Sequence, residues 1–337
     1  RQLYLKFYNI MRFNFLRKPN KIRKKIFNKF FYLSSGRFLS RFLMLLGIPH
    51  KNVRHIARKL RTIMNLKEVI DRKVQADIHL QKYNCSLRIN DRLGYSAVDI
   101  NQLNYGKEML EISKLIISQA KNESVYNSGK SFKKDLLSPQ DLKDYPVFIR
   151  FASDPYLISS IAQYLGTFPV LSSIRIWETV KNTSTISSQL FHIDQEDFTQ
   201  LKFFINLTDV YHENGPITAI NAIKSKEIYQ VSTNPFVRLS DDYINNYAKE
   251  SDFFEGSGPK GRGFLIDTSR CFHMGSRTRV GNRIMLILSY HRSPGIFEPS
   301  IKSNTMFNEL GINVEEMPDL YSKMLLSPLR PNYLSLE

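Results

Sequence analysis

The stretch QLFHIDQEDF, residues 189–198, places a histidine and an aspartate two positions apart in a run typical of a strand. In an extended chain, residues i and i+2 point to the same side, about 6.5–7 Å apart along the backbone. We therefore expect His192 and Asp194 to project side by side. They could be two metal ligands or a surface pair on an edge strand, and the rest of the chain has to decide between these.

A second histidine follows the pair at a distance that suits the same site. His273 lies in the run DTSRCFHMGS, directly after the expected strand GFLID. Two imidazoles and one carboxylate can occupy one face of an octahedron around Fe(II), which leaves three positions open. A 2-oxoacid can chelate through two of these positions, and dioxygen can take the third. The pattern of His192, Asp194 and His273 therefore indicates a mononuclear iron site.

Arg283, ten residues after His273, supplies the cation that a dicarboxylic co-substrate would need. It opens the expected strand RIMLILSY, in which Arg283, Met285, Ile287 and Ser289 alternate onto one face. An arginine that points into a barrel is costly unless it is paired. A guanidinium is planar, permanently charged and bidentate, so the far carboxylate of 2-oxoglutarate would satisfy it.

The elements that must position these residues change in kind at Gly166. Upstream, runs such as GKEMLEISKLIISQA and SDPYLISSIAQYLG predict helices, while DYPVFIRF predicts a short strand. Downstream, short segments rich in β-branched and aromatic residues alternate with turn residues. These segments are PVLSSIRIWETV, SQLFHIDQED, QLKFFINLTDV, GPITAINA, GRGFLIDTS and NRIMLILSYHR. Repeated short strands predict a sandwich or barrel.

We therefore expect an α+β protein whose core is a double-stranded β-helix, a cupin-like jelly roll, with a helical N-terminal half packed on it. Four regions follow from the sequence pattern. They are a basic helical N-terminal region (1–67), a mostly helical segment before the core (68–140), the jelly-roll core (141–300) and an irregular C-terminal tail (301–337).

The positive charge of the chain is concentrated in its N-terminal fifth. The net charge of the 337 residues is +17, and residues 1–67 hold 18 lysines and arginines without an acid, so the remainder carries 17 − 18 = −1. Residues 1–67 could bind an anionic membrane surface or an acidic protein, or form a solvated cap on the core. We see no motif for sequence-specific binding of nucleic acids.

The cysteines and the apolar runs bear on the cellular location of the protein. Cys85 and Cys271 do not form a CxxC pair, and we expect Cys271 to be a small buried residue near the site rather than a ligand. No uncharged apolar run approaches the roughly 18 residues of a membrane-spanning helix. We expect a reducing, cytoplasmic location, with peripheral attachment to a membrane as a further option.

Two runs resemble the phytanoyl-CoA dioxygenase family of Fe(II)- and 2-oxoglutarate-dependent oxygenases. They are QLFHIDQEDFTQLKFFINLTDVYHENGP and GFLIDTSRCFHMGSRTRVGNRIMLILSY, and the resemblance covers about residues 146–292. It implies that His192, Asp194 and His273 are the iron ligands and that Arg283 binds 2-oxoglutarate. It also implies oxidative decarboxylation to succinate and carbon dioxide, coupled to hydroxylation of a C–H bond.

The chain departs from the family pattern at one turn. After ENGP the family usually has Pro-Gly-Ser-His-Lys, whereas this chain has NAIKS, residues 221–225. The resemblance places this turn near the mouth of the pocket, so the departure concerns the substrate more than the chemistry. Asp194 argues against the halogenating variants, which leave that ligand position open for chloride.

Other polar residues have weaker claims to the site. Gln189 precedes the histidine–aspartate pair, and Lys202 shares a strand face with Phe204 and Asn206, so both are candidates for pocket contacts. Lys202 could equally be a solvent-side residue on a half-exposed strand. The remaining candidates are less suited: Arg277 and Arg279 in an exposed turn, His212 on the surface, and His291 past the end of the last strand.

The sequence predicts an Fe(II)- and 2-oxoglutarate-dependent dioxygenase that hydroxylates a small molecule or a carrier-bound metabolite with dioxygen. A cupin-type metal enzyme on the same barrel is one alternative, and it would not need Arg283 or 2-oxoglutarate. A non-catalytic binding protein that acts through its basic N-terminal region is another. The second alternative predicts normal partner binding after replacement of His273.

Overall fold

The computed structural model describes residues 50–83, 87–120, 127–130, 133–181, 186–195, 197–232, 238–275, 277–295 and 325–326. The chain divides into two units, Arg1–Met64 and Asn65–Glu337. Helix α4, His50–Met64, is the described part of the first unit. The expectations for the basic residues 1–49 and for nearly all of the tail 301–337 lie outside the described residues. Within the described ranges, no helix is long and apolar enough to cross a membrane.

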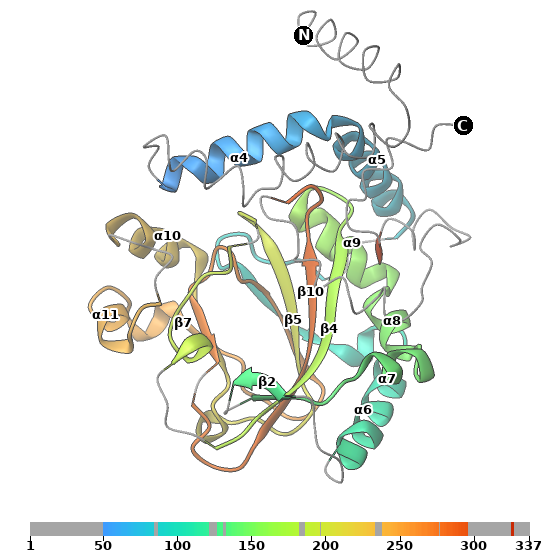
Figure 1. The fold of residues 1–337 in the computed structure, drawn as a ribbon, viewed down its shortest axis with the longest axis vertical. Helices are drawn as coiled ribbons and strands as arrows, with labels where there is room; N and C mark the ends of the chain where they lie inside the picture. Colours follow the sequence, from blue (N-terminus) through green and yellow to red (C-terminus); the bar gives the residue numbers. More distant parts are fainter. Residues whose placement is uncertain are drawn as a thin grey trace, which may run out of the picture. The chain divides into compact units, whose positions relative to one another are not determined.

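A seven-stranded antiparallel sheet is the main layer of the second unit (Figure 1), in the order β1-β8-β5-β10-β4-β3-β2. Its strands are β1 Tyr95–Asp99, β2 Asn127–Lys130, β3 Lys133–Asp135, β4 Val170–Thr179, β5 Gln200–Asn206, β8 Arg262–Asp267 and β10 Arg283–His291. Met285 of β10 lies opposite Asn206 of β5 on one side and Trp177 of β4 on the other. β10 is buried along its whole length, which explains its nearly continuous apolar sequence.

A three-stranded antiparallel sheet packs against the large one. Its order is β7-β6-β9, with β6 Ile217–Ile220, β7 Phe253–Glu255 and β9 His273–Gly275. One buried apolar cluster takes side chains from both sheets, among them Phe204, Phe264, Met285, Ile217 and Ala219. Two sheets that share a buried cluster pack face to face. The predicted α+β fold with a jelly-roll core is therefore confirmed.

Helices cover the other face of the large sheet. They are α5 Leu66–Lys82, α6 Gly106–Ala120, α7 Pro139–Asp144, α8 Val147–Ala152 and α9 Pro155–Leu165. Their buried side chains form one cluster with Leu286, Leu288 and Tyr290 of β10. Figure 1 shows α6 to α9 along one side of β5, β10 and β4. Since successive strand residues point to opposite faces, Met285 and Ile287 point instead into the interior between the sheets.

Helix α9 has the start and stop that its sequence predicts. The Asp154 side chain accepts hydrogen bonds from the backbone nitrogens of Tyr156 and Leu157, both at 2.9 Å, and Pro155 occupies the first helical position. Gly166 ends the helix with φ 66°, in the left-handed region. These caps fix where α9 presents Tyr164 to the end of β8.

Two expectations for the chain upstream of Gly166 differ from the structure. DYPVFIRF forms helix α8 instead of a strand, because Phe148 and Phe151, three positions apart, both reach the buried cluster under the sheet. A short apolar run cannot be assigned to helix or strand by periodicity alone. The segment 68–140 is also less helical than predicted, since it supplies β1 at the edge of the sheet and the short strands β2 and β3.

Between β6 and β8 the chain forms helices α10, Ala222–Val231, and α11, Asp241–Asn245. The NAIKS stretch starts α10, with the Asn221 side chain accepting a hydrogen bond from the backbone nitrogen of Lys224 at 2.8 Å. The described residues also include short 3₁₀ turns, namely η1 Ile100–Gln102, η2 Ser187–Gln189, η3 His212–Asn214 and η4 Glu250–Asp252. The departure from the family turn is therefore a capped helix.

Candidate metal centre

His192, Asp194 and His273 come together although about eighty residues separate them in the chain. One ligand atom from each lies within 4.8 Å of the others. His192 and His273 form an antiparallel bridge, with backbone N–O distances of 3.0 and 2.9 Å, and their ring centroids are 4.4 Å apart. The backbone nitrogen of Asp194 donates to the carbonyl of Thr268 at 2.8 Å. Backbone pairing thus holds all three side chains on one face.

The predicted strand through QLFHIDQED is shorter than expected. Only isolated bridges form there among the described residues, at Phe191 and His192. Asp194 is joined to Thr268 by a single backbone hydrogen bond. The side-by-side placement of His192 and Asp194 therefore results from single backbone contacts with His273 at the start of β9 and with Thr268 after β8, and not from a regular ladder.

Both imidazoles are prepared to act as neutral ligands. Nδ1 of His192 donates to the carbonyl of Leu190 at 2.9 Å, and Nδ1 of His273 donates to the carbonyl of Cys271 at 3.1 Å. This pairing leaves the lone pair on each Nε2. Burial is the main reason that the pKa of His192 falls to about 3, and burial also lowers the pKa of His273. Both rings are therefore uncharged at neutral pH.

Asp194 is held as a carboxylate. Nζ of Lys202 lies 2.6 Å from Oδ2 of Asp194, and Nε2 of Gln200 donates to the same oxygen at 2.9 Å. Burial alone would raise the pKa of Asp194, but nearby charges, above all that of Lys202, outweigh it and hold the pKa well below its usual range. Oδ2 also lies 3.7 Å from Nε2 of His273.

This donor set fits a divalent transition metal. Two neutral imidazole nitrogens and one carboxylate oxygen converge from one side, and the second ring nitrogen of each histidine is oriented by a backbone carbonyl. Such a facial set of two histidines and one carboxylate suits Fe(II) and leaves positions for further ligands.

Arg283 is a buried cation without a carboxylate partner among the described residues. It is 6% exposed, and its guanidinium donates to the carbonyl of Gly215 and to Oγ1 of Thr179, the latter at 3.2 Å. Its Nε has no hydrogen-bond partner in the part of the chain that the structure describes. Burial lowers the pKa of Arg283 to about 10, so it is still charged at neutral pH.

The position of Gly275 shows where the Arg283 guanidinium lies relative to the metal ligands. A Cβ on Gly275 would lie 3.1 Å from Nη2 of Arg283, so the guanidinium lies directly over that glycine. Gly275 follows His273 by two positions in β9 and shares its face. The guanidinium therefore lies about 6.5–7 Å along the strand from the His273 position, on the same side of the sheet.

The two candidates for pocket contacts differ in position. Lys202 reaches Asp194 from β5, on the strand face that it shares with Phe204 and Asn206, opposite Ser289 of β10. Gln189 is buried at the end of η2, and its backbone carbonyl accepts a hydrogen bond from Arg277 at 2.9 Å. Lys202 thus touches the triad directly, and the backbone carbonyl of Gln189 binds Arg277.

Among the residues given weaker claims, two expectations were wrong. His291 is the last residue of β10, not a residue beyond it, and burial lowers its pKa to about 4, with a further contribution from the charge of Lys202. Arg277 is not a solvated turn residue, because its side chain is 17% exposed and forms two contacts with Asp241, at 2.5 and 3.2 Å.

The other three expectations of this kind agree with the structure. Arg279 is exposed, and His212 has a side chain that is 73% exposed and lies 2.9 Å from Glu255. Cys271 is fully buried, with Sγ 3.4 Å from the carbonyl of Leu93. Within the described chain, the converging ligand atoms come from the triad, and neither His212 nor Cys271 adds one.

Sequence reasoning missed Gln200, Thr268 and Asp267, which support the triad from behind. Nε2 of Gln200 bridges Asp194 and Oγ1 of Thr268, the latter at 3.0 Å. The side chain of Asp267 accepts hydrogen bonds from the backbone nitrogens of Gln200, Ser269 and Arg270 and from the Tyr164 hydroxyl. Gln200 could have been found, because it lies two positions before Lys202 on the same strand face.

The Asp267 carboxyl should make the stability of the fold depend on pH. Burial raises its pKa from 3.8 to about 7 although Arg270 lies nearby. Between these pH values the folded protein keeps a proton that the unfolded chain releases, so this group lowers the free energy of unfolding as the pH rises. We expect Asp267→Asn to remove this dependence. The stability of the variant relative to wild type should rise by up to about 1.4 kcal/mol per pH unit.

The measurement is chemical denaturation of the metal-free protein from pH 4 to pH 7. Asp77→Asn, which changes an exposed aspartate of α5, is the matched control and should leave the pH profile as in wild type. Equal pH profiles for Asp267→Asn and wild type would contradict the raised pKa.

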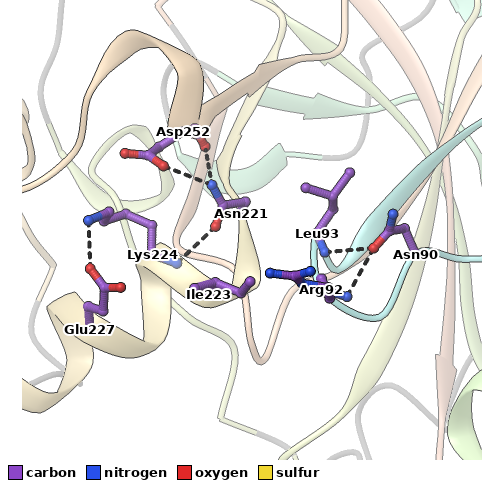
Figure 2. A pocket seen from close by; sticks show the side chains of 8 residues that line it. All are labelled: Asn90, Arg92, Leu93, Asn221, Ile223, Lys224, Glu227 and Asp252. Atoms are coloured by element: carbon purple, nitrogen blue, oxygen red, sulfur yellow. Dashed lines mark hydrogen bonds and ion pairs between the residues drawn. The ribbon is translucent and has the colours of Figure 1, made fainter.

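A surface hollow of about 530 Å³ lies at the start of α10 (Figure 2). It is lined by Asn90, Arg92, Leu93, Asn221, Ile223, Lys224, Glu227 and Asp252. Lys224 pairs with Glu227 at 2.5 Å, and the Asn221 side chain donates to Asp252 at 3.0 Å. The stretch that departs from the family turn therefore lines this hollow, and no member of the triad does.

A scan against protein-family models and a search of curated proteins both gave no match. Solved structures give distant matches. HygX from Streptomyces hygroscopicus with nickel, 2-oxoglutarate and hygromycin B bound is 14% identical, with 60% of this chain and 85% of that chain covered and a TM-score of 0.42.

Two further structures match at a similar level. The epimerase SnoN in complex with Fe3+, alpha ketoglutarate and nogalamycin RO is 13% identical, covers 77% of this chain and 93% of its own, and has a TM-score of 0.43. EctD from S. alaskensis with 2-oxoglutarate and 5-hydroxyectoine is 15% identical. The match covers 60% of this chain and 73% of the EctD chain, with a TM-score of 0.43.

Proposed function

We propose that the protein is an Fe(II)- and 2-oxoglutarate-dependent oxygenase that uses dioxygen to hydroxylate a small molecule. The observation that carries this proposal is the pairing of a two-histidine, one-carboxylate centre with a buried arginine that lacks a carboxylate partner among the described residues. The arginine lies on the same side of β9 as His273, two residues along. 2-Oxoglutarate has a chelating end for the metal and a far carboxylate for the arginine.

Each residue has a separate task in this function. His192, Asp194 and His273 would hold Fe(II), which supplies the redox chemistry with dioxygen. Arg283 would orient 2-oxoglutarate through its far carboxylate, and the absence of a side chain at Gly275 leaves room beside that contact. Lys202 and Gln200 bind Oδ2 of Asp194 and keep the carboxylate ionised and oriented.

We further propose membership of the phytanoyl-CoA dioxygenase family. The support is the order and spacing of His192, Asp194, His273 and Arg283 in the sequence, together with the positions of His273 on β9 and Arg283 on β10. Whether the substrate is free or bound to a carrier depends on residues outside the triad. We also propose that residues 1–67 dock an acidic carrier or an anionic membrane. Residues 1–49 of this region lie outside the described residues.

The test is an anaerobic titration of the metal-free protein with Fe(II) and then with 2-oxoglutarate. We expect the weak visible charge-transfer band of the chelate, and its loss in His273→Ala. His212→Ala is the matched control, because His212 is a largely exposed histidine on the surface, and it should leave the band unchanged. Iron binding without a band would favour the cupin-type alternative, and no iron binding would overturn the proposed metal centre.

A further inference from the structure

His192 lies between two backbone bridges, and an arginine lies opposite it on the outer side. On one side His192 bridges His273. On the other side the preceding residue, Phe191, bridges Leu239 in antiparallel orientation, with N–O distances of 3.0 and 2.8 Å. In this register the residue opposite His192 is Arg238. Directly opposite residues of antiparallel strands project from the same face, with Cβ atoms about 4.5–5.5 Å apart.

Arg238 therefore projects from the face that carries the metal ligands. It is exposed, and it forms no ion pair or hydrogen bond with another residue in the described ranges. Its charge reaches both histidines: burial is the main cause of the lowered pKa values of His192 and His273, and Arg238 adds to the lowering in each. A cation at this place is next to the centre and open to solvent.

The backbone around Arg238 is held firmly from two sides. Leu239 is bonded to Phe191 through both of its backbone groups. Asp241, the first residue of α11, accepts two contacts from Arg277, and Arg277 also donates to the carbonyl of Gln189 at 2.9 Å. The segment 238–241 is thus fastened to the chain that leads into His192, so Arg238 is presented at a fixed position beside the centre.

Among the described residues, the charges near the centre leave Arg238 without a counterpart. Lys202 is paired with Asp194 at 2.6 Å. In the proposed function, on which this inference rests, the far carboxylate of 2-oxoglutarate pairs with Arg283. We infer that Arg238 binds an anionic group, a carboxylate or a phosphate, of the primary substrate. A guanidinium suits both groups, because its planar fork matches two oxygens of either.

The experiment uses the full chain loaded anaerobically with Fe(II) and 2-oxoglutarate, with benzoate, phenyl phosphate and the neutral benzamide as probes. Each probe is titrated at constant ionic strength, and the shift of the chelate band is recorded. We expect benzoate or phenyl phosphate to half-saturate at a concentration about tenfold lower than benzamide. The better of the two anions identifies the kind of group.

The arginine is tested by three substitutions. Arg238→Gln should remove the preference for the anion, Arg238→Lys should keep part of it, and Arg238→Glu should reverse it, while the band before addition of probe stays the same. Arg279→Gln changes an exposed arginine in the segment after β9 and should behave as wild type.

The outcomes separate this inference from the proposed function. A normal band with equal affinity for anion and benzamide, or a preference that survives Arg238→Gln, would overturn the inference alone. Displacement of 2-oxoglutarate by the anion, seen as loss of the band, would assign the anion to Arg283 and also overturn it. Absence of the band in wild type would overturn the proposed function and this inference together.

Discussion

Asp194→Ala is expected to lower the affinity for Fe(II) by at least about 100-fold, because substitutions that only touch a ligand from behind already cost about 10–100-fold. The substitution removes the single carboxylate of the triad. It also leaves the ammonium group of Lys202 without the carboxylate that lies 2.6 Å away. A positive charge next to the ion then opposes binding. The dissociation constant is measured by anaerobic competition with a chelator of known affinity.

A double substitution separates the two causes. In Asp194→Ala combined with Lys202→Met, the repulsion is absent, so part of the lost affinity should return relative to Asp194→Ala alone. Asp242→Ala, which changes an exposed aspartate in α11, is the control and should bind Fe(II) as wild type does. Equal affinities for Asp194→Ala and wild type would remove Asp194 from the metal centre.

Sequence patterns predicted the structure correctly where it depends on neighbouring residues alone. Asp154, Pro155 and Gly166 marked the ends of α9, because capping depends on a few neighbouring residues. The alternation of Arg283 and Met285 correctly assigned one face of β10 to the interior, since the period of two is a property of any strand.

Prediction was weaker where tertiary contacts decide the structure. The run through Phe148 folds as a helix because its apolar side chains fit under the sheet, and the same residues would suit a strand. Arg277 was expected in solvent, but Asp241, 36 residues earlier, binds it. A local sequence pattern cannot predict an ion-pair partner that far away in the chain.

The candidate site shows the same division. The types and spacing of His192, Asp194 and His273 indicate metal chemistry by themselves, and the fold brings their ligand atoms within 4.8 Å of one another. No sequence pattern indicated that Arg238 belongs to the site. Its place beside His192 depends on the bridge between Phe191 and Leu239, 48 positions apart in the chain. Residues that a site gains through register between distant segments require the structure.

Arg283→Met should separate co-substrate binding from both metal binding and stability. We expect the half-saturating concentration of 2-oxoglutarate to rise about 100-fold, since loss of one partner of a buried, hydrogen-bonded charge pair costs about 2–5 kcal/mol. Fe(II) affinity should not change, because Arg283 contacts Gly215 and Thr179 and none of the three ligands. Arg283→Lys keeps the charge but loses the planar fork, so its affinity for 2-oxoglutarate should lie between those of wild type and Arg283→Met.

The stability of Arg283→Met without co-substrate distinguishes a binding role from a structural one. Removing the arginine deprives the carbonyl of Gly215 and the hydroxyl of Thr179 of a donor, which costs about 1–3 kcal/mol. It also removes a buried charge that has no carboxylate partner among the described residues, so the cost of desolvating that charge on folding disappears with it. The melting temperature should therefore change little. A large fall in melting temperature with unchanged 2-oxoglutarate binding would make Arg283 a structural residue and would favour the metal enzyme that does not use this co-substrate.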